Sequence, residues 1–75
     1  MAHILYIVGL EPSSNTRRDL KNLQDKGFKF AYVTMCDGKT IIQVGSFTLI
    51  ENALLYRDEL RAKGFDAFVK MKIMA

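Results

Sequence analysis

An internal repeat constrains the fold of this 75-residue chain more than any other feature of its sequence. Residues 42–45 resemble residues 6–9 at an offset of 36, and residues 63–65 resemble residues 26–28 at an offset of 37. Similarity at a nearly constant offset indicates that one structural unit occurs twice along the chain. The sequence therefore predicts a domain built from two similar halves.

The second half has the clearer pattern, which is strand, helix, strand. Ile42 and Val44 alternate with polar or small residues, as in a half-buried strand. Thr48 lies three residues before Glu51, the spacing of a capping box in which both side chains bond free amides at the start of a helix. Gly64 is expected to end that helix, because glycine adopts the left-handed cap conformation without steric cost.

The first half repeats this pattern more weakly. Thr16 and Asp19 have the same capping-box spacing, and Gly27 is the expected helix end. The apolar stripe of this first helix is thin and consists chiefly of Leu20 and Leu23. Its remaining charged positions are interpreted as a solvated face.

A tight hairpin is expected between the halves, since Asp37-Gly38 suits a turn with positive φ at both central residues. The expected strands are 3–10, 28–35, 39–47 and 66–73, with a first helix at 16–26 and a second ended by Gly64. With right-handed crossovers, the order βαββαβ predicts an α+β, ferredoxin-like (RNP-like) two-layer sandwich. It has a four-stranded antiparallel sheet with two helices on one face, in one domain at 1–75 with repeats at about 3–35 and 40–74.

The composition excludes several classes of function. Cys36 is the only cysteine, so no internal disulfide forms, and with His3 as the only histidine the chain has no zinc ligand set. We expect no enzyme, metal site or cofactor, because no nucleophile is accompanied by a base and an orienting partner. The net charge of +3 is only weak support for a polyanionic partner, and no apolar run is long enough to span a membrane.

Strand parity predicts which side chains the sheet leaves uncovered, since successive residues of a strand point to opposite faces. The residues expected beneath the helices are Tyr6, Val8, Ala31, Val33, Ile42, Val44, Ala67 and Val69. The residues expected on the opposite, open face are Leu5, Ile7, Phe30, Tyr32, Ile41, Gln43, Phe68, Lys70 and Lys72. This apolar and aromatic surface predicts a binding site, unless a bulge breaks the parity or the C-terminal residues fold over the face.

The second half resembles a SPOR domain and is most similar to those of sporulation-type cell-wall amidases. The resemblance rests on Gln-Val-Gly-Ser-Phe at 43–47, Glu-Asn-Ala at 51–53, Leu60, and Lys-Gly-Phe-Asp-Ala-Phe-Val at 63–69. It implies a βαββαβ fold and a non-catalytic module whose open sheet face binds peptidoglycan glycan strands stripped of stem peptides. Such a module would be the C-terminal targeting domain of an amidase or phage endolysin.

The resemblance also implies particular site residues. Gln43 and Ser46 would be polar glycan contacts, and Gly45 would permit close approach of backbone or ligand. Phe47 is expected in the core beneath the second helix. Strand parity, and not the family motif, adds the other candidate ligand-binding residues, which are Ile7, Phe30, Tyr32, Ile41, Phe68 and Lys70.

The location expected from the sequence depends on what precedes the chain. The first residues show no signal peptide, which predicts a cytoplasmic protein if the chain is full length. An excised module of an exported protein would instead be extracellular or in the cell wall.

Two alternatives remain open. In the first half, Ile7 replaces the motif glutamine and the phenylalanine expected two residues after Gly9 is missing. This drift towards apolar character favours a protein-interaction or homodimerisation domain that uses the open face. A nucleic-acid binder of the RNA-recognition-motif type shares the topology, but that family stacks bases on aromatics in strand three. Ile42 and Val44 occupy those places here, so we rank this alternative last.

Overall fold

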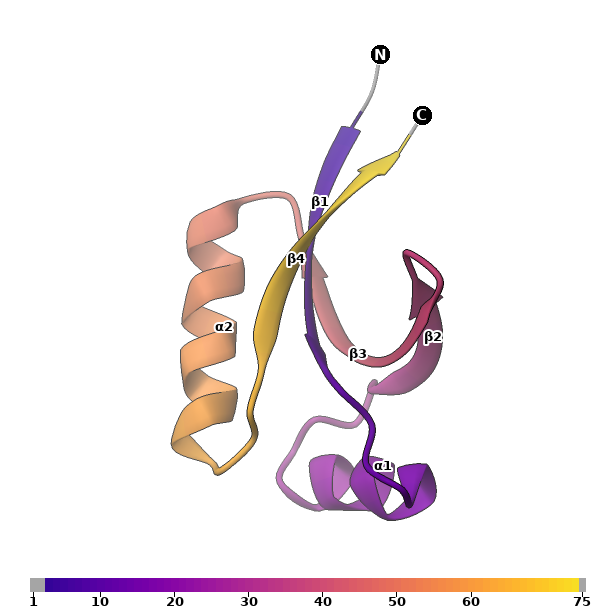
Figure 1. Ribbon diagram of the computed structural model, residues 1–75. Coiled ribbons are helices and arrows are strands. Elements are labelled where there is room, and N and C mark those ends of the chain that lie inside the picture. The colour runs from indigo at the N-terminus through magenta and orange to yellow at the C-terminus, as the bar shows by residue number, and fades with distance from the viewer. Residues whose placement is uncertain (1–2, 75) are drawn as a thin grey trace.

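Four antiparallel strands form one sheet in the protein, seen in a computed structural model that describes residues 3–74. In chain order the elements are β1 (His3–Leu10), α1 (Thr16–Asp25), β2 (Tyr32–Cys36), β3 (Lys39–Phe47), α2 (Ile50–Ala62) and β4 (Phe68–Met74). The strands pair in the order β2-β3-β1-β4, so each βαβ half supplies one central and one edge strand. This α+β, ferredoxin-like layout is the fold predicted from the repeat (Figure 1).

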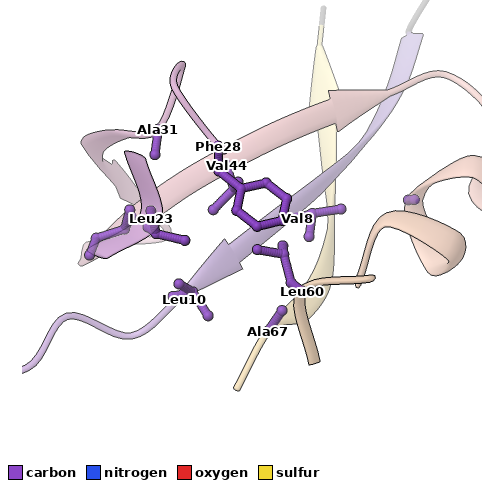
Figure 2. Packing of buried hydrophobic residues seen from close by; sticks show 10 residues of the cluster. Val8, Leu10, Leu23, Phe28, Ala31, Val44, Leu60 and Ala67 are labelled. Carbon is purple, nitrogen blue, oxygen red and sulfur yellow. The ribbon is translucent and has the colours of Figure 1, made fainter. Parts of the chain in front are cut away.

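The core lies between the sheet and the helices. Val8, Leu23, Ile42 and Leu60 are fully buried and come from β1, α1, β3 and α2 respectively. Phe28 adds an aromatic ring to this cluster, beside Val8, Val44 and Leu60 (Figure 2). Apolar burial from all four elements explains how so short a chain assembles a continuous core without a covalent link.

The two helices cover the sheet unequally. α2 lies along one face, here called the helix face, whereas α1 lies at the end of the sheet (Figure 1). Leu23 is the buried residue of α1, and the partly buried Leu20 packs against the same core. Because α1 lies at the end of the sheet, Val33 is 42% exposed, although its cross-strand partner Ile42 is buried on the helix face. The parity expected for Val33 is correct, but no helix covers it.

Strand β2 is shorter than predicted. It begins at Tyr32 and not at Phe28, because the Phe28 ring packs edge-on against Tyr56 and Phe65, with centroid distances of 5.6 and 6.1 Å. The chain therefore turns after Phe28 before it enters the sheet, and Phe30 lies in this turn.

The first helix begins at Thr16, as predicted, but the predicted capping boxes are wrong. The N-cap of α2 is Leu49 and makes no side-chain hydrogen bond, so Thr48 does not cap that helix. At α1 the cap is Asn15, whose Oδ1 accepts a hydrogen bond of 3.1 Å from the amide of Arg18. The side chain of Asp19 instead accepts bonds of 2.7–2.8 Å from the amide and hydroxyl of Ser13.

The predicted helix ends at Gly27 and Gly64 and the predicted hairpin turn at Asp37-Gly38 are confirmed. Gly27 and Gly64 have φ of +101° and +92° and follow the last turns of α1 and α2. Asp37 and Gly38 both have positive φ, 52° and 78°, as the tight hairpin between β2 and β3 requires.

Candidate functional site

One row of residues crosses the open face of the sheet, the face opposite α2. Tyr32 on β2 pairs with Gln43 on β3, Gln43 with Gly9 on β1, and Gly9 with Phe68 on β4. This cross-sheet row therefore carries an aromatic ring at each edge and an amide side chain between them. A methyl group on Gly9 would lie 3.3 Å from Cζ of Phe68, which shows that the Phe68 ring reaches over the glycine.

A β-bulge decides which residues of β3 join the open face. Val8 pairs with Gly45, but the next residue of β1 pairs with Gln43, so Val44 is the extra residue. The bulge reverses the alternation of side chains beyond it. Ser46 consequently pairs with Ile7 and is exposed on the open face, and Phe47 enters the core.

The position of Phe47 confirms one expectation. Its ring centroid lies 5.3 Å from that of Tyr56 on α2. Strict alternation from Val44 would have reversed the places of Phe47 and Ser46, so the bulge is what allows both to occupy the positions that the motif implies.

A second, small apolar cluster lies on the open face. Ile7, Cys36 and Ile41 form it, with Leu5 and Phe68 packed against them. Ile7 and Ile41 are only 3% and 4% exposed. The expectation that these two residues present an open apolar patch is therefore wrong, although their parity is right.

The burial follows from the curvature of the sheet. β3 bends so that the β2–β3 hairpin lies on the side of the sheet away from α2 (Figure 1). At the tip of the hairpin, a carboxylate oxygen of Asp37 lies 2.9 Å from Nζ of Lys70 on β4. The edge strand β2 carries this tip across the face to the other edge strand, with Cys36 buried beneath it.

The Asp37–Lys70 bridge also affects the charge of the site. The hydrogen bond to the Asp37 carboxylate raises the pKa of Lys70 above its ordinary value; partial desolvation opposes this rise, and the negative charge of Asp37 adds to it. Lys70 therefore remains an ammonium group over the whole neutral range.

A groove lies between the hairpin and β4. Its volume is about 460 Å³, and its lining residues are Glu11, Pro12, Lys39, Thr40, Ile41, Phe68, Val69 and Lys70. We call it the Phe68 groove. One wall is the start of β3 and the other is the start of β4, and Lys70, which lines the groove, is also the partner of Asp37 in the ion pair. An aromatic ring, a hydroxyl, a carboxylate and two ammonium groups suit a polar ligand that also has apolar patches.

The structure brings most of the predicted site residues together, but it separates two of them. Gln43, Ser46, Tyr32, Phe68 and Lys70 share the open face with the buried Ile7 and Ile41. A Cβ on Gly45 would lie 3.0 Å from the Tyr56 ring, so its close approach is to α2 and not to the open face. Phe30 precedes β2 and is 89% exposed, outside the row.

Sequence reasoning missed several groove residues. Lys39 and Thr40 lie in the predicted third strand, and their place in a groove beside β4 depends on the bend of the hairpin. Glu11 lies in the predicted turn after β1 and lines the same groove. No local pattern signals such a meeting, because it depends on the curvature of the whole sheet.

Comparison with protein-family models, curated proteins and solved structures gives no match to this chain. Within residues 3–74, no helix is long and apolar enough to cross a membrane. Over the same residues, no group of three or more His, Cys, Asp or Glu side chains is arranged to hold a metal ion.

Proposed function

We propose that the protein is a non-catalytic binding module for peptidoglycan glycan strands, and that its open sheet face is the binding surface. In this proposal it recognises glycan stripped of stem peptides and directs a linked amidase or endolysin domain to such sites in the cell wall. The observation that carries the proposal is the cross-sheet row, in which Gln43 lies between two aromatic edge residues, Tyr32 and Phe68.

The chemistry of the row suits the sugar rings and hydroxyl groups of a glycan. Sugar rings have apolar C–H faces that pack on aromatic rings and hydroxyl groups that exchange hydrogen bonds with amide and hydroxyl side chains. Gln43 and Ser46 supply such groups within the resembling motif, and both lie on the open face. Tyr32 and Phe68 supply the rings from the two edges of the sheet.

The Phe68 groove adds charged groups to this surface. Removal of a stem peptide leaves a free carboxylate on the glycan, where an amide bond stood before. Lys39 lines the groove and supplies an ammonium group that favours such a carboxylate, whereas the ammonium group of Lys70 is already paired with Asp37 and Glu11 adds a negative charge. Lys39 therefore supports binding of stripped glycan to this groove.

No observation of comparable weight supports the two alternatives, a homodimer through the open face or a nucleic-acid binder. A homodimer through the open face was suggested by its aliphatic residues, but Ile7 and Ile41 are already buried beneath the hairpin. For nucleic acid, the open-face positions of the central strands are Leu5, Ile7 and Gly9 on β1 and Ile41, Gln43 and Ser46 on β3. None of these offers a ring on which a base can stack.

The direct test is co-sedimentation with purified peptidoglycan sacculi, before and after treatment with an amidase that removes the stem peptides. We expect the bound fraction to be several-fold larger on treated sacculi. Soluble glycan fragments without stem peptides should compete for this binding. Equal binding to both preparations would contradict the proposed selectivity, and binding to neither would exclude the proposed ligand.

A further inference from the structure

The sheet has two free edges, and they differ in charge. β2 and β4 each pair with one neighbour only among the described residues, so each leaves a row of backbone donors and acceptors without a strand partner. Proteins commonly protect such edges with lysine side chains. β4 carries Lys70 and Lys72, whereas β2, from Tyr32 to Cys36, carries no charged residue.

The unprotected edge is also apolar. Val33 and Met35 of β2 point to the helix face, opposite Ile42 and Thr40, and are 42% and 63% exposed. They remain exposed because α1 lies at the end of the sheet and does not extend over β2 (Figure 1). Two residues before the strand, Phe30 is 89% exposed and adds a further apolar side chain beside this edge.

We propose that β2 pairs with β2 of a second copy of this chain, antiparallel and around a two-fold axis at Thr34. In this register Thr34 meets Thr34, and Val33 of each copy meets Met35 of the other on the helix face. Tyr32 meets Cys36 on the open face. Apolar cross-strand pairs and a Thr–Thr pair are favourable combinations in antiparallel sheets.

A second copy fits this edge because two-fold pairing places like sequence against like sequence. A charge close to the axis would therefore lie near the same charge of the other copy, and Tyr32–Cys36 contains none. On β4, the same operation would bring two sets of lysines together. The edge that lacks charge is thus the one that can pair with itself without repulsion, and the two sheets would join as one eight-stranded sheet.

The interface is small, because β2 has only five residues. It buries less than the roughly 1,600 Å² of a standard protein interface, which predicts a weak, concentration-dependent dimer. The dimer does not depend on the proposed function. It would leave the Phe68 groove of each copy free, since β3 and β1 separate β2 from β4.

Two methionines provide a matched pair of substitutions. Met35 on β2 and Met71 on β4 are 63% and 62% exposed, and each lies in an edge strand. Sedimentation equilibrium of the full chain should show a monomer–dimer equilibrium. Met35→Lys should weaken dimerisation at least tenfold, whereas Met71→Lys should leave it within about twofold of the parent chain.

Cysteine cross-linking tests the register. Thr34→Cys should form a disulfide-linked dimer under mild oxidation, because facing residues at the axis have Cβ atoms about 4.5–5.5 Å apart. Val33→Cys, which faces Met35 of the other copy, should link several-fold more slowly. The native Cys36 serves as an internal control, since it faces Tyr32 and should not link the parent chain.

The outcomes decide the proposal. Peptide mapping of a linkage between two copies of position 34, together with the Met35→Lys effect, would support it. A parent chain that stays monomeric up to millimolar concentration would overturn it. Loss of dimerisation in Met71→Lys but not in Met35→Lys would place the contact on the other edge and overturn it equally.

Discussion

Gln43 is the polar side chain at the centre of the cross-sheet row, between Tyr32 and Gly9. We expect Gln43→Ala to remove one or two hydrogen bonds to glycan and to cost about 0.5–1.5 kcal/mol of binding free energy. Affinity for amidase-treated sacculi should therefore fall by about two- to tenfold, measured by co-sedimentation.

The matched control is Gln24→Ala, on the exposed surface of α1. It should leave binding unchanged, and both variants should keep their free energy of unfolding within about 0.5–1 kcal/mol. Equal losses of binding in the two variants, or none in Gln43→Ala, would show that Gln43 is not part of the site.

Val44 and Val33 lie on the same face of the sheet but differ in burial, so alanine substitutions at the two positions compare the loss of a buried and of an exposed side chain. Both point towards the helix face, but Val44 is buried in the core and Val33 is 42% exposed. We expect Val44→Ala to lower the free energy of unfolding by about 1–3 kcal/mol, because it removes buried methyl groups and leaves a cavity. Val33→Ala should cost about 0.5 kcal/mol or less in the isolated chain.

Urea denaturation followed by circular dichroism measures both values. It should be run below the concentration at which the proposed dimer forms, because Val33 lies in that interface. Similar losses in the two variants would contradict the placement of α1 away from β2.

Parity along the strands located most of the open face, but not every residue on it. The repeat predicted that Tyr6, Val8, Ile42 and Val44 lie beneath the helices, and all four belong to the core or pack on it. The bulge at Val44 could not be read from a strict alternation. At the bulge the ring of Tyr56 lies close to Gly45, a contact between residues in different elements that no local pattern signals.

The β2–β3 hairpin is the element that changes the character of the open face. Its two-residue turn was predicted, and β3 has the predicted bounds, Lys39–Phe47. Its curvature over the face was not predicted, because it brings the hairpin against the opposite edge strand, where Asp37 meets Lys70. The cover over Ile41 and Ile7 is therefore tertiary in origin.

Asp37→Asn tests whether the bridge holds the hairpin in place. Asparagine tolerates the positive φ of 52° at this position but carries no charge to pair with Lys70. The hairpin should open more often, which would expose the buried thiol of Cys36. We expect the rate of Cys36 labelling by a thiol reagent to rise several-fold under native conditions.

Asp25→Asn, at the end of α1, is the control for the loss of a carboxylate. Its labelling rate should match that of the parent chain. An unchanged rate in Asp37→Asn would mean that packing of Ile41 and Phe68 alone keeps the hairpin closed.

For the whole molecule, two groups link stability to alkaline pH. Burial raises the pKa of Tyr56 above 10.0, with a further rise from the Glu59 carboxylate, and the bond to Asp37 raises the pKa of Lys70 above 10.5. A raised pKa in the folded state means that the folded protein holds the proton more tightly. The stabilisation is complete below the ordinary pKa values and is lost as the pH rises through the folded ones.

We therefore expect a nearly constant free energy of unfolding from neutral pH to about pH 9, and a decline above about pH 10. Urea midpoints measured at steps of pH give this curve. Tyr56→Phe should flatten the decline, because it removes one of the linked protons, whereas Tyr32→Phe is the control at an exposed tyrosine. An identical decline in Tyr56→Phe and the parent chain would contradict the link.

The Asp37–Lys70 bridge has a consequence for any anionic ligand of the Phe68 groove. Lys70 lines the groove and is already paired with Asp37, so an anionic group that reaches Lys70 must share its ammonium group with the hairpin or displace Asp37 from it. Occupation of the groove and closure of the hairpin would then be coupled.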